Sequence, residues 1–226
     1  MRVHRSHSSV ISNTAIMGIK GFRAWFESQF PRAMRDLEKE TSHETFDHVL
    51  IDMNQLLHIA LRRAVSEGHA LAMLMKELDA CVELATPTTS LVLAVDGPPS
   101  AAKLATQRRR RFGTWNKSEW KQRQLARFTK TLSKRQELAF RRRYATEVKT
   151  LCITPGTDFM ALAEQCLLYW AWQRLQNPRH ILANVKIYIS SSNVPGEGEI
   201  KLIDWILQTN RNGESIALMG DRKSVV

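Results

Sequence analysis

The chain contains few of the residues that build disulfide-stapled or membrane-spanning proteins. Its 226 residues include three cysteines, Cys81, Cys152 and Cys166, and no two of them have a paired spacing. An odd and unpaired set argues against a disulfide framework or a zinc site, and it favours a reducing compartment. No apolar run approaches the length of a membrane span. We therefore expect an intracellular protein without a membrane partner.

Acidic residues are scarce relative to basic ones. The chain has 33 Lys and Arg against 22 Asp and Glu, which gives a net charge of +11 and an isoelectric point near 10.0. A basic excess of this size favours a polyanionic partner, above all nucleic acid. Composition alone favours equally a protein that only binds RNA and an enzyme that acts on it.

The first sixteen residues have no acid at all and are rich in Ser and basic residues. That composition resembles a mitochondrial transit peptide. However, the segment MGIKGFRAWF, which has the pattern of an ordered region, begins at Met17. We therefore favour Met17 as the start, and we expect residues 1–16 to be a disordered or wrongly assigned extension. A cytoplasmic or nuclear location is then favoured over a mitochondrial one.

Short apolar segments that alternate with helical patterns predict an α/β fold in one domain. The helical patterns include 54–66, 68–84 and a basic stretch from about 99 to 150, followed by helices after Thr157 and after the segment PGEGE. The last of these helices carries Ile200, Ile203, Ile206 and Leu207 on its expected apolar side. Strands are expected at 48–52, 91–95, 186–190 and 216–220. Such alternation predicts a mainly parallel sheet flanked by helices.

Acidic residues follow three of the expected strands. In an open parallel sheet the ligand site lies beyond the carboxyl ends of the strands, so these acids are expected to converge. Singly, each is better explained as a helix cap or a solvated loop residue, but four at one edge favour divalent metal binding. Phosphodiester hydrolysis uses two Mg²⁺ or Mn²⁺ ions about 3.5–4 Å apart, held by hard oxygen ligands. The candidate metal ligands and catalytic residues are Asp52, Asp96, Glu197 and Glu199.

A basic helical face follows Asp96 in the sequence. Lys103, Gln107, Arg110 and Arg111 have the spacing i, i+4, i+7 and i+8, so they share one side of a helix. Forked Arg donors and a Lys charge there are suited to a terminal phosphate, although a solvated basic face is the common alternative. His58, six residues after Asp52, is either structural or able to stack on a base.

Five sequence blocks occur in order between Met17 and about Gly220. The blocks are MGIKGFRAWF, VLIDMNQLLH, LAVDGPPSAAKLATQRRRRF, ITPGTDFM and VPGEGEIKLIDWI. Together they resemble the N-terminal nuclease region of the Xrn 5'-to-3' exoribonucleases, and the last two are highly specific. The related flap endonucleases share the opening and both aspartates but carry a different acidic block.

The resemblance implies a Rossmann-like fold of the PIN and flap-nuclease type. It also implies a Mg²⁺-dependent, processive enzyme that removes mononucleotides from single-stranded RNA with a 5'-monophosphate. In the family, the residues that match the four acids are metal ligands, and those that match the basic face bind the 5'-phosphate. The residue that matches His58 stacks on the first base. One departure is Gln55, where the family usually has Gly.

The end of the chain is the second departure. The family has an Asp-x-Asp pair after the last strand, where this chain has Arg222 and Ser224. Residues 221–226, DRKSVV, match the translation of a widely used sequencing adapter. We therefore expect this tail to be foreign, the nuclease domain (17–220) to be incomplete at its C-terminus, and the 226-residue chain to be inactive.

Two other functions remain open on the sequence. A catalytically inactive RNA-binding protein would keep the basic face and use no metal. A structure-specific flap nuclease is disfavoured by the PGEGE segment. The sequence identifies no protein partner.

Overall fold

A computed structural model describes residues 21–31, 44–128, 133–139, 150–209, 213–221 and 224–225. The chain divides into two units, residues 1–41 and residues 42–226. The first unit contains helix α1 (Phe22–Gln29). The expected extension, residues 1–16, lies outside the described residues, as do positions 222, 223 and 226 of the expected foreign tail.

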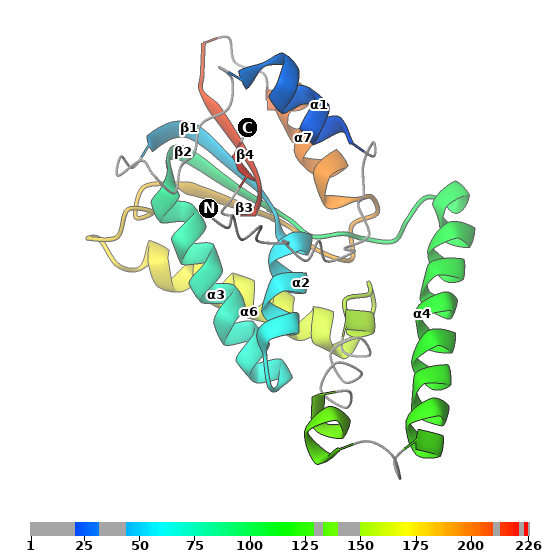
Figure 1. Ribbon diagram of the computed structural model, residues 1–226. Coiled ribbons are helices and arrows are strands. Elements are labelled where there is room, and N and C mark those ends of the chain that lie inside the picture. Colours follow the sequence, from blue (N-terminus) through cyan, green and yellow to red (C-terminus); the bar gives the residue numbers. More distant parts are fainter. Residues whose placement is uncertain are drawn as a thin grey trace, which may run out of the picture. The chain divides into compact units, whose positions relative to one another are not determined.

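The second unit is built on a five-stranded sheet with the order β3-β2-β1-β4-β5 (Figure 1). The first four strands pair in parallel, and the short β5 runs antiparallel to β4. This confirms the expected α/β fold with a mainly parallel sheet. The strands are β1 (Glu44–Asp52), β2 (Ala85–Ala94), β3 (Lys186–Ser190), β4 (Ile216–Asp221) and β5 (Ser224–Val225).

Strands β1 and β2 begin earlier than the sequence pattern predicted. The added part of β2 contains Pro87, which has no N–H to donate to a neighbouring strand. The pairing of β1 with β2 shifts register between Phe46 and His48, next to the point where Phe46 faces Pro87. The strand therefore extends past a proline at an irregularity of the ladder.

Helices connect the parallel strands, and polar side chains cap their first turns. Ser66 Oγ accepts the His69 N–H at 3.2 Å, and Thr157 Oγ1 accepts the Met160 N–H at 3.4 Å. None of the described helices is long and apolar enough to cross a membrane. They are α2 (Met53–Arg63), α3 (Glu67–Leu84), α4 (Ala101–Phe128), the 3₁₀ turn η2 (Thr150–Cys152), α6 (Asp158–Leu175) and α7 (Gly198–Thr209).

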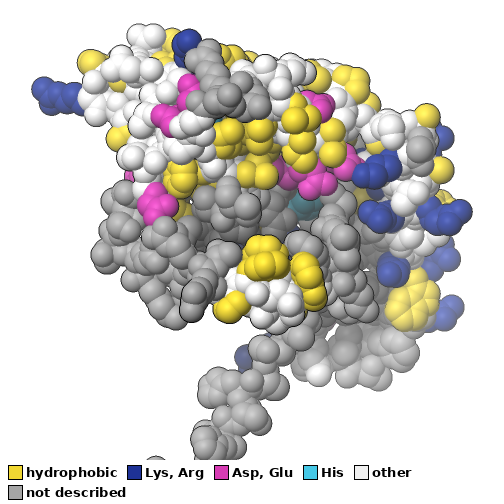
Figure 2. All heavy atoms as spheres, turned by 90° about the horizontal axis from the view of Figure 1, so that it is seen from above, with side chains coloured by type: hydrophobic (Ala, Val, Ile, Leu, Met, Phe, Trp, Pro, Cys, Tyr) yellow, Lys and Arg dark blue, Asp and Glu magenta, His cyan; other side chains and the backbone are white. Residues whose placement is uncertain are grey.

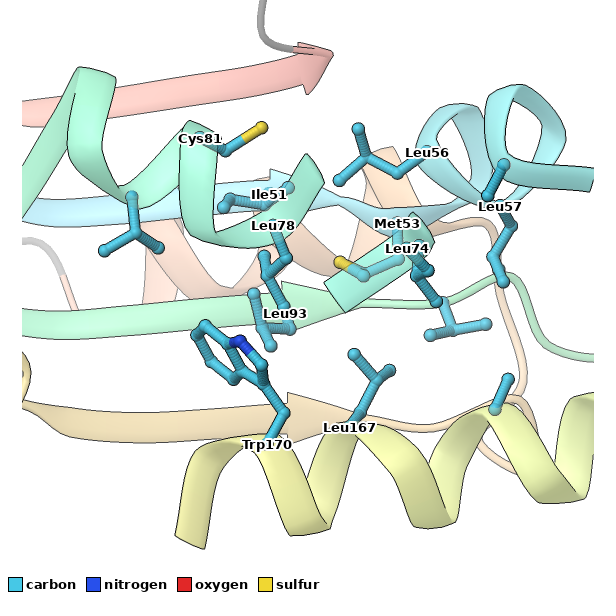
Figure 3. Packing of buried hydrophobic residues seen from close by; sticks show 14 of the residues in the cluster. Ile51, Met53, Leu56, Leu57, Leu74, Leu78, Cys81, Leu93, Leu167 and Trp170 are labelled. Atoms are coloured by element: carbon cyan, nitrogen blue, oxygen red, sulfur yellow. The ribbon is translucent and has the colours of Figure 1, made fainter. Parts of the chain in front are cut away.

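Helices α2, α3 and α6 cover one face of the sheet with the larger core. Leu78 of α3, Leu93 of β2 and Trp170 of α6 point into this core (Figure 3), and each is at most 1% exposed. A polar clamp joins α3 to α6, because Asp79 accepts hydrogen bonds from Trp170 Nε1 at 2.8 Å and from Arg174 Nη2 at 2.6 Å. Burial of one such side chain stabilises the fold by about 1.5–3 kcal/mol.

Among the described helices of residues 42–226, α7 covers the opposite face, where the core is small. Its buried members are Leu50, Val92, Ala94 and Leu202. The expected apolar side of α7 was wrong for three of its four residues, since Ile200, Ile203 and Leu207 are 46%, 44% and 71% exposed, whereas Ile206 packs against this core. The backbone N–H of Gly198 is bonded to Asp96, and this contact fixes the rotation of the helix. Leu202 therefore faces the sheet instead.

Candidate functional site at the carboxyl edge of the sheet

Asp52 and Asp96 come to the same edge because β1 and β2 are parallel neighbours. Asp52 is the last residue of β1 and also caps α2, since its Oδ1 accepts the Asn54 N–H at 3.0 Å. Asp96 follows the end of β2, and its Oδ1 accepts the Gly198 N–H at 2.6 Å. Its Oδ2 accepts a short hydrogen bond from Asn54 Nδ2. Asn54 therefore bridges the two carboxylates.

Gly198 is in close contact with the carboxylate edge. A Cβ atom at this position would lie 2.8 Å from Asp52 Oδ1 and 3.3 Å from the carbonyl oxygen of Ala94. Any side chain would therefore push against Asp52 or the end of β2. The close approach explains why glycine stands between Glu197 and Glu199.

Hydrogen bonds join the loop after β3 to the loop after β2. Gly97 donates its N–H to Gly196 O at 2.8 Å, and Gly196 donates to Pro98 O at 3.1 Å. Lys201 Nζ donates to Val95 O at 2.7 Å and to Ser191 O at 2.9 Å. These contacts hold the segment with Glu197 and Glu199 against the segment with Asp96.

Sequence reasoning missed Lys201 and Asn54. Both stand beside predicted acids, Lys201 two residues after Glu199 and Asn54 two residues after Asp52. The signal that could have identified them was a side-chain amide or a cation two residues after a candidate metal ligand. Burial lowers the pKa of Lys201, and the negative charge of Asp96 opposes that effect.

The edge is electrostatically unfavourable for several ionised acids. Burial raises the pKa of Asp52 to about 6, and the charges of Asp96, Glu199 and Glu197 add to this effect. The hydrogen bond from the Asn54 N–H opposes it. Burial also raises the pKa of Asp96, with a further contribution from Glu197. Carboxyl groups with shifted pKa values are common at functional sites, because ligand binding or catalysis requires charged groups there even where burial destabilises them.

The two glutamates take different positions relative to the aspartates. Glu197 forms an ion pair with Lys103 of α4, whose Nζ lies 2.6 Å from Oε2 and 2.7 Å from Oε1. Glu199 acts on Asp52 through its charge. Within the described parts of the chain, no group of three or more His, Cys, Asp or Glu side chains is arranged to hold a metal ion. The four acids share one edge, and their assignment as metal ligands stays a prediction.

The predicted phosphate-binding residues lie on α4. Lys103 is at its beginning, in contact with Glu197, and Arg111 Nη2 reaches Gln107 Oε1 at 3.4 Å. Lys103 and Arg110 are exposed, and Gln107 and Arg111 are half-buried. Figure 2 shows acidic side chains gathered beside the Lys and Arg side chains on the side of the molecule where α4 lies. A basic face therefore adjoins the acidic edge, and the role of its residues in phosphate binding stays a prediction.

His58 lies on α2, six residues after the Asp52 cap, and is half-buried. Burial lowers its pKa, and the charge of Arg62 adds to that effect. The ring is therefore neutral near pH 7. A neutral aromatic ring is suited to stacking on a base, which remains a prediction for this residue.

Residues 17–218 match the family described as XRN 5'-3' exonuclease N-terminus. The chain is 27% identical over 215 residues to the 5'-3' exoribonuclease 2 homolog of Drosophila melanogaster, an overlap of 84% of this chain and 24% of that protein. It is 28% identical over 197 residues to the 5'-3' exoribonuclease 1 of Homo sapiens, covering 84% of this chain and 11% of that protein.

A similar match covers a fungal relative. The 5'-3' exoribonuclease 2 of Candida albicans is 28% identical over 211 residues, which is 84% of this chain and 22% of that protein. This chain thus spans about a quarter or less of the length of these relatives.

Proposed function

This chain belongs to the XRN 5'-3' exonuclease N-terminus family, and on that premise we propose that it is part of an enzyme that degrades RNA from the 5' end. The substrate is single-stranded RNA with a 5'-monophosphate, and the products are mononucleotides. We also propose a cytoplasmic or nuclear location. The relatives named as 5'-3' exoribonucleases support the proposed activity.

The observation that carries the proposal is the contact between the acidic edge and the basic face. Glu197, from the edge, and Lys103, from α4, are in direct contact at 2.6 Å. A phosphate bound by Lys103 would therefore lie next to the carboxylates of Asp52 and Asp96. This is the arrangement that an exonuclease needs, because the terminal phosphate must be held while the next phosphodiester bond meets the catalytic groups.

The donor chemistry of the edge fits Mg²⁺ or Mn²⁺. The donors are carboxylate oxygens, which these ions prefer, and the four acids would hold them. Asn54 supports the fit, because its Oδ1 is buried and has no hydrogen-bond partner within the described residues. When bound, two such ions activate water and stabilise the leaving oxygen.

The protein's own groups keep the acids in place and position the substrate. Asn54 and the Gly198 N–H hold Asp96, while the α2 cap holds Asp52. Lys103, with the donors of Gln107, Arg110 and Arg111, would bind the terminal phosphate. A cap or a triphosphate is larger than a monophosphate, so we propose that such RNAs must first be converted.

Two fluorescent RNA oligonucleotides that differ only in a 5'-monophosphate or a 5'-hydroxyl group test the proposal. We expect the phosphorylated RNA to bind about tenfold more tightly, because charged hydrogen bonds to phosphate are each worth 1.5–3 kcal/mol. Lys103→Ala should reduce this preference, and Arg127→Ala, which removes a charge near the end of α4, should not. Equal binding of both oligonucleotides would contradict the proposed 5'-phosphate site.

Degradation in Mg²⁺ is the second measurement, and Asp96→Asn is its control. Shortening of the phosphorylated RNA from its 5' end, lost in Asp96→Asn, would support the enzyme. Retained phosphate preference without degradation would favour the RNA-binding alternative. Faster cleavage of flap DNA than of single-stranded RNA would favour the flap nuclease.

A further inference from the structure

The ion pair between Lys103 and Glu197 joins the basic face to the acidic edge, and its two partners differ in exposure. Lys103 Nζ lies 2.7 Å from Oε1 and 2.6 Å from Oε2 of Glu197, so one ammonium group faces both oxygens of the carboxylate. The Lys103 side chain is 58% exposed and the Glu197 side chain is 14% exposed. A solute can therefore reach the lysine, while the carboxylate is largely covered.

Each partner of the pair opposes the ligand proposed for the other. A divalent ion on Glu197 would place a second positive charge beside the Lys103 ammonium group, and a phosphate on Lys103 would place a second negative charge beside Glu197. When both ligands bind, the phosphate and the metal ion neutralise the two side chains instead. The charge of Glu197 also raises the pKa of Asp96, so Glu197 released from Lys103 strengthens the attraction of the edge for a cation.

Lys201 of α7 cannot replace Lys103 as the partner of Glu197. Its Nζ donates to the carbonyl oxygen of Val95 at 2.7 Å and to that of Ser191 at 2.9 Å. These two hydrogen bonds hold its ammonium group between the loops after β2 and β3. Exchange of the partner of Glu197 therefore depends on Lys103.

We propose that the Lys103–Glu197 ion pair couples recognition of the 5'-phosphate to metal binding at the acidic edge. A 5'-phosphate takes Lys103 from Glu197, and the freed carboxylate then binds the divalent ion more tightly. An RNA with a 5'-hydroxyl end leaves the pair intact and meets the metal site in its weaker state. The inference rests on the proposed function and describes the regulation of that same site.

The first test measures binding of uridine 5'-monophosphate and of uridine by isothermal titration calorimetry in EDTA. A mononucleotide has no phosphodiester bond, so catalysis does not enter the readout. We expect Glu197→Gln to bind the monophosphate about fivefold more tightly than the original protein, because the carboxylate no longer competes for Lys103. Glu199→Gln removes the same charge from a residue that acts on Asp52, and it should give a gain below about twofold.

The second test measures Mn²⁺ binding from the electron paramagnetic resonance of the free ion, corrected for Mn²⁺ bound by the nucleotide alone. In the original protein, saturating uridine 5'-monophosphate should tighten Mn²⁺ binding about fivefold, and uridine should not. Lys103→Gln should bind Mn²⁺ more tightly without nucleotide, and the monophosphate should then add less than about twofold. Arg109→Gln removes an exposed charge of α4 outside the phosphate-binding set and should keep the fivefold effect.

Two outcomes would overturn the coupling. Unchanged or weaker monophosphate binding in Glu197→Gln would show that Glu197 does not compete for Lys103, and weaker binding would mean that it positions the lysine instead. An equal effect of the monophosphate on Mn²⁺ binding in the original protein and in Lys103→Gln would show that the metal senses the phosphate directly.

The same measurements separate this inference from the proposed function. If none of the proteins binds the monophosphate more tightly than uridine, the 5'-phosphate site itself is contradicted, and the coupling with it. If the original protein prefers the monophosphate and Glu197→Gln does not change its affinity, the 5'-phosphate site stands and only the coupling is refuted.

Discussion

Within the described part of residues 42–226, the two faces of the sheet carry cores of different size. Helices α2, α3 and α6 cover one face with a large core, whereas α7 covers the other with a small one (Figure 1). The difference coincides with the placement of the site. Helix α7 begins at Gly198, whose N–H is bonded to Asp96, so its orientation is set at the carboxylate edge. Its apolar residues adapt to that orientation.

The large core stabilises the fold, whereas the carboxylate edge positions charged groups at the cost of stability. The large core can tolerate an unfavourable group elsewhere, because its many buried side chains each contribute on the order of a kcal/mol or more. The edge holds carboxylates whose charges oppose folding. We therefore expect core substitutions to destabilise the protein and charge removal at the edge to stabilise it.

The largest expected effect is that of Leu78→Ala on the large core. Leu78 is 0% exposed between α3 and the sheet, so the substitution leaves a cavity. Loss of a buried leucine side chain costs about 2–5 kcal/mol of unfolding free energy. Urea denaturation followed by circular dichroism measures it. An effect below about 1 kcal/mol would mean that the face is loosely packed and that the contrast with α7 is wrong.

Asp52→Asn should have the next largest effect, with the opposite sign. A rise in the Asp52 pKa from 3.8 to about 6 destabilises the ionised form by up to about 3 kcal/mol. Asparagine has no charge, retains the oxygen that accepts the Asn54 N–H and is itself a good helix cap. We expect the variant to be more stable than the original protein at pH 7 without divalent metal.

The pH dependence provides the control for that substitution. Between pH 4 and pH 6 the folded protein binds a proton at Asp52 that the unfolded chain does not bind, so stability falls as pH rises through this window. The loss becomes complete about one pH unit above the folded-state pKa of about 6. Asp52→Asn should lack this component, and identical pH profiles for the two proteins would show that burial does not shift the carboxyl group.

The sequence predicted the strand ends and the gathering of acids better than the helix orientations. Strand 186–190 was predicted with its observed bounds, because its apolar pattern and the following turn are both local signals. The beginning of β2 was missed, since Pro87 is usually excluded from a strand and only the pairing with β1 accommodates it. The local sequence pattern therefore predicted the central part of β2, and pairing with β1 extended the strand beyond it.

In the candidate site, too, only the features that follow from local pattern and strand topology could be predicted. Placing Asp52 and Asp96 at one edge follows from parallel topology, which the alternation of elements predicts. The ion pair of Glu197 with Lys103 could not be predicted, because it depends on how α4 lies relative to the loop after β3. Asn54 was missed because its role depends on Asp96, forty-two residues away in the sequence.

The smallest expected effect is that of Leu207→Ala, on the exposed side of α7. Leu207 is 71% exposed, and alanine has the better helix propensity, so we expect a change within about 0.5 kcal/mol. The same urea measurement used for Leu78→Ala gives a direct comparison of two leucines, one in the large core and one on the exposed side of α7. A loss of 2 kcal/mol or more would show that this side of α7 is covered in solution. Leu207 would then belong to a larger core on the α7 face. The two faces would differ in what covers them and not in how much apolar surface they bury.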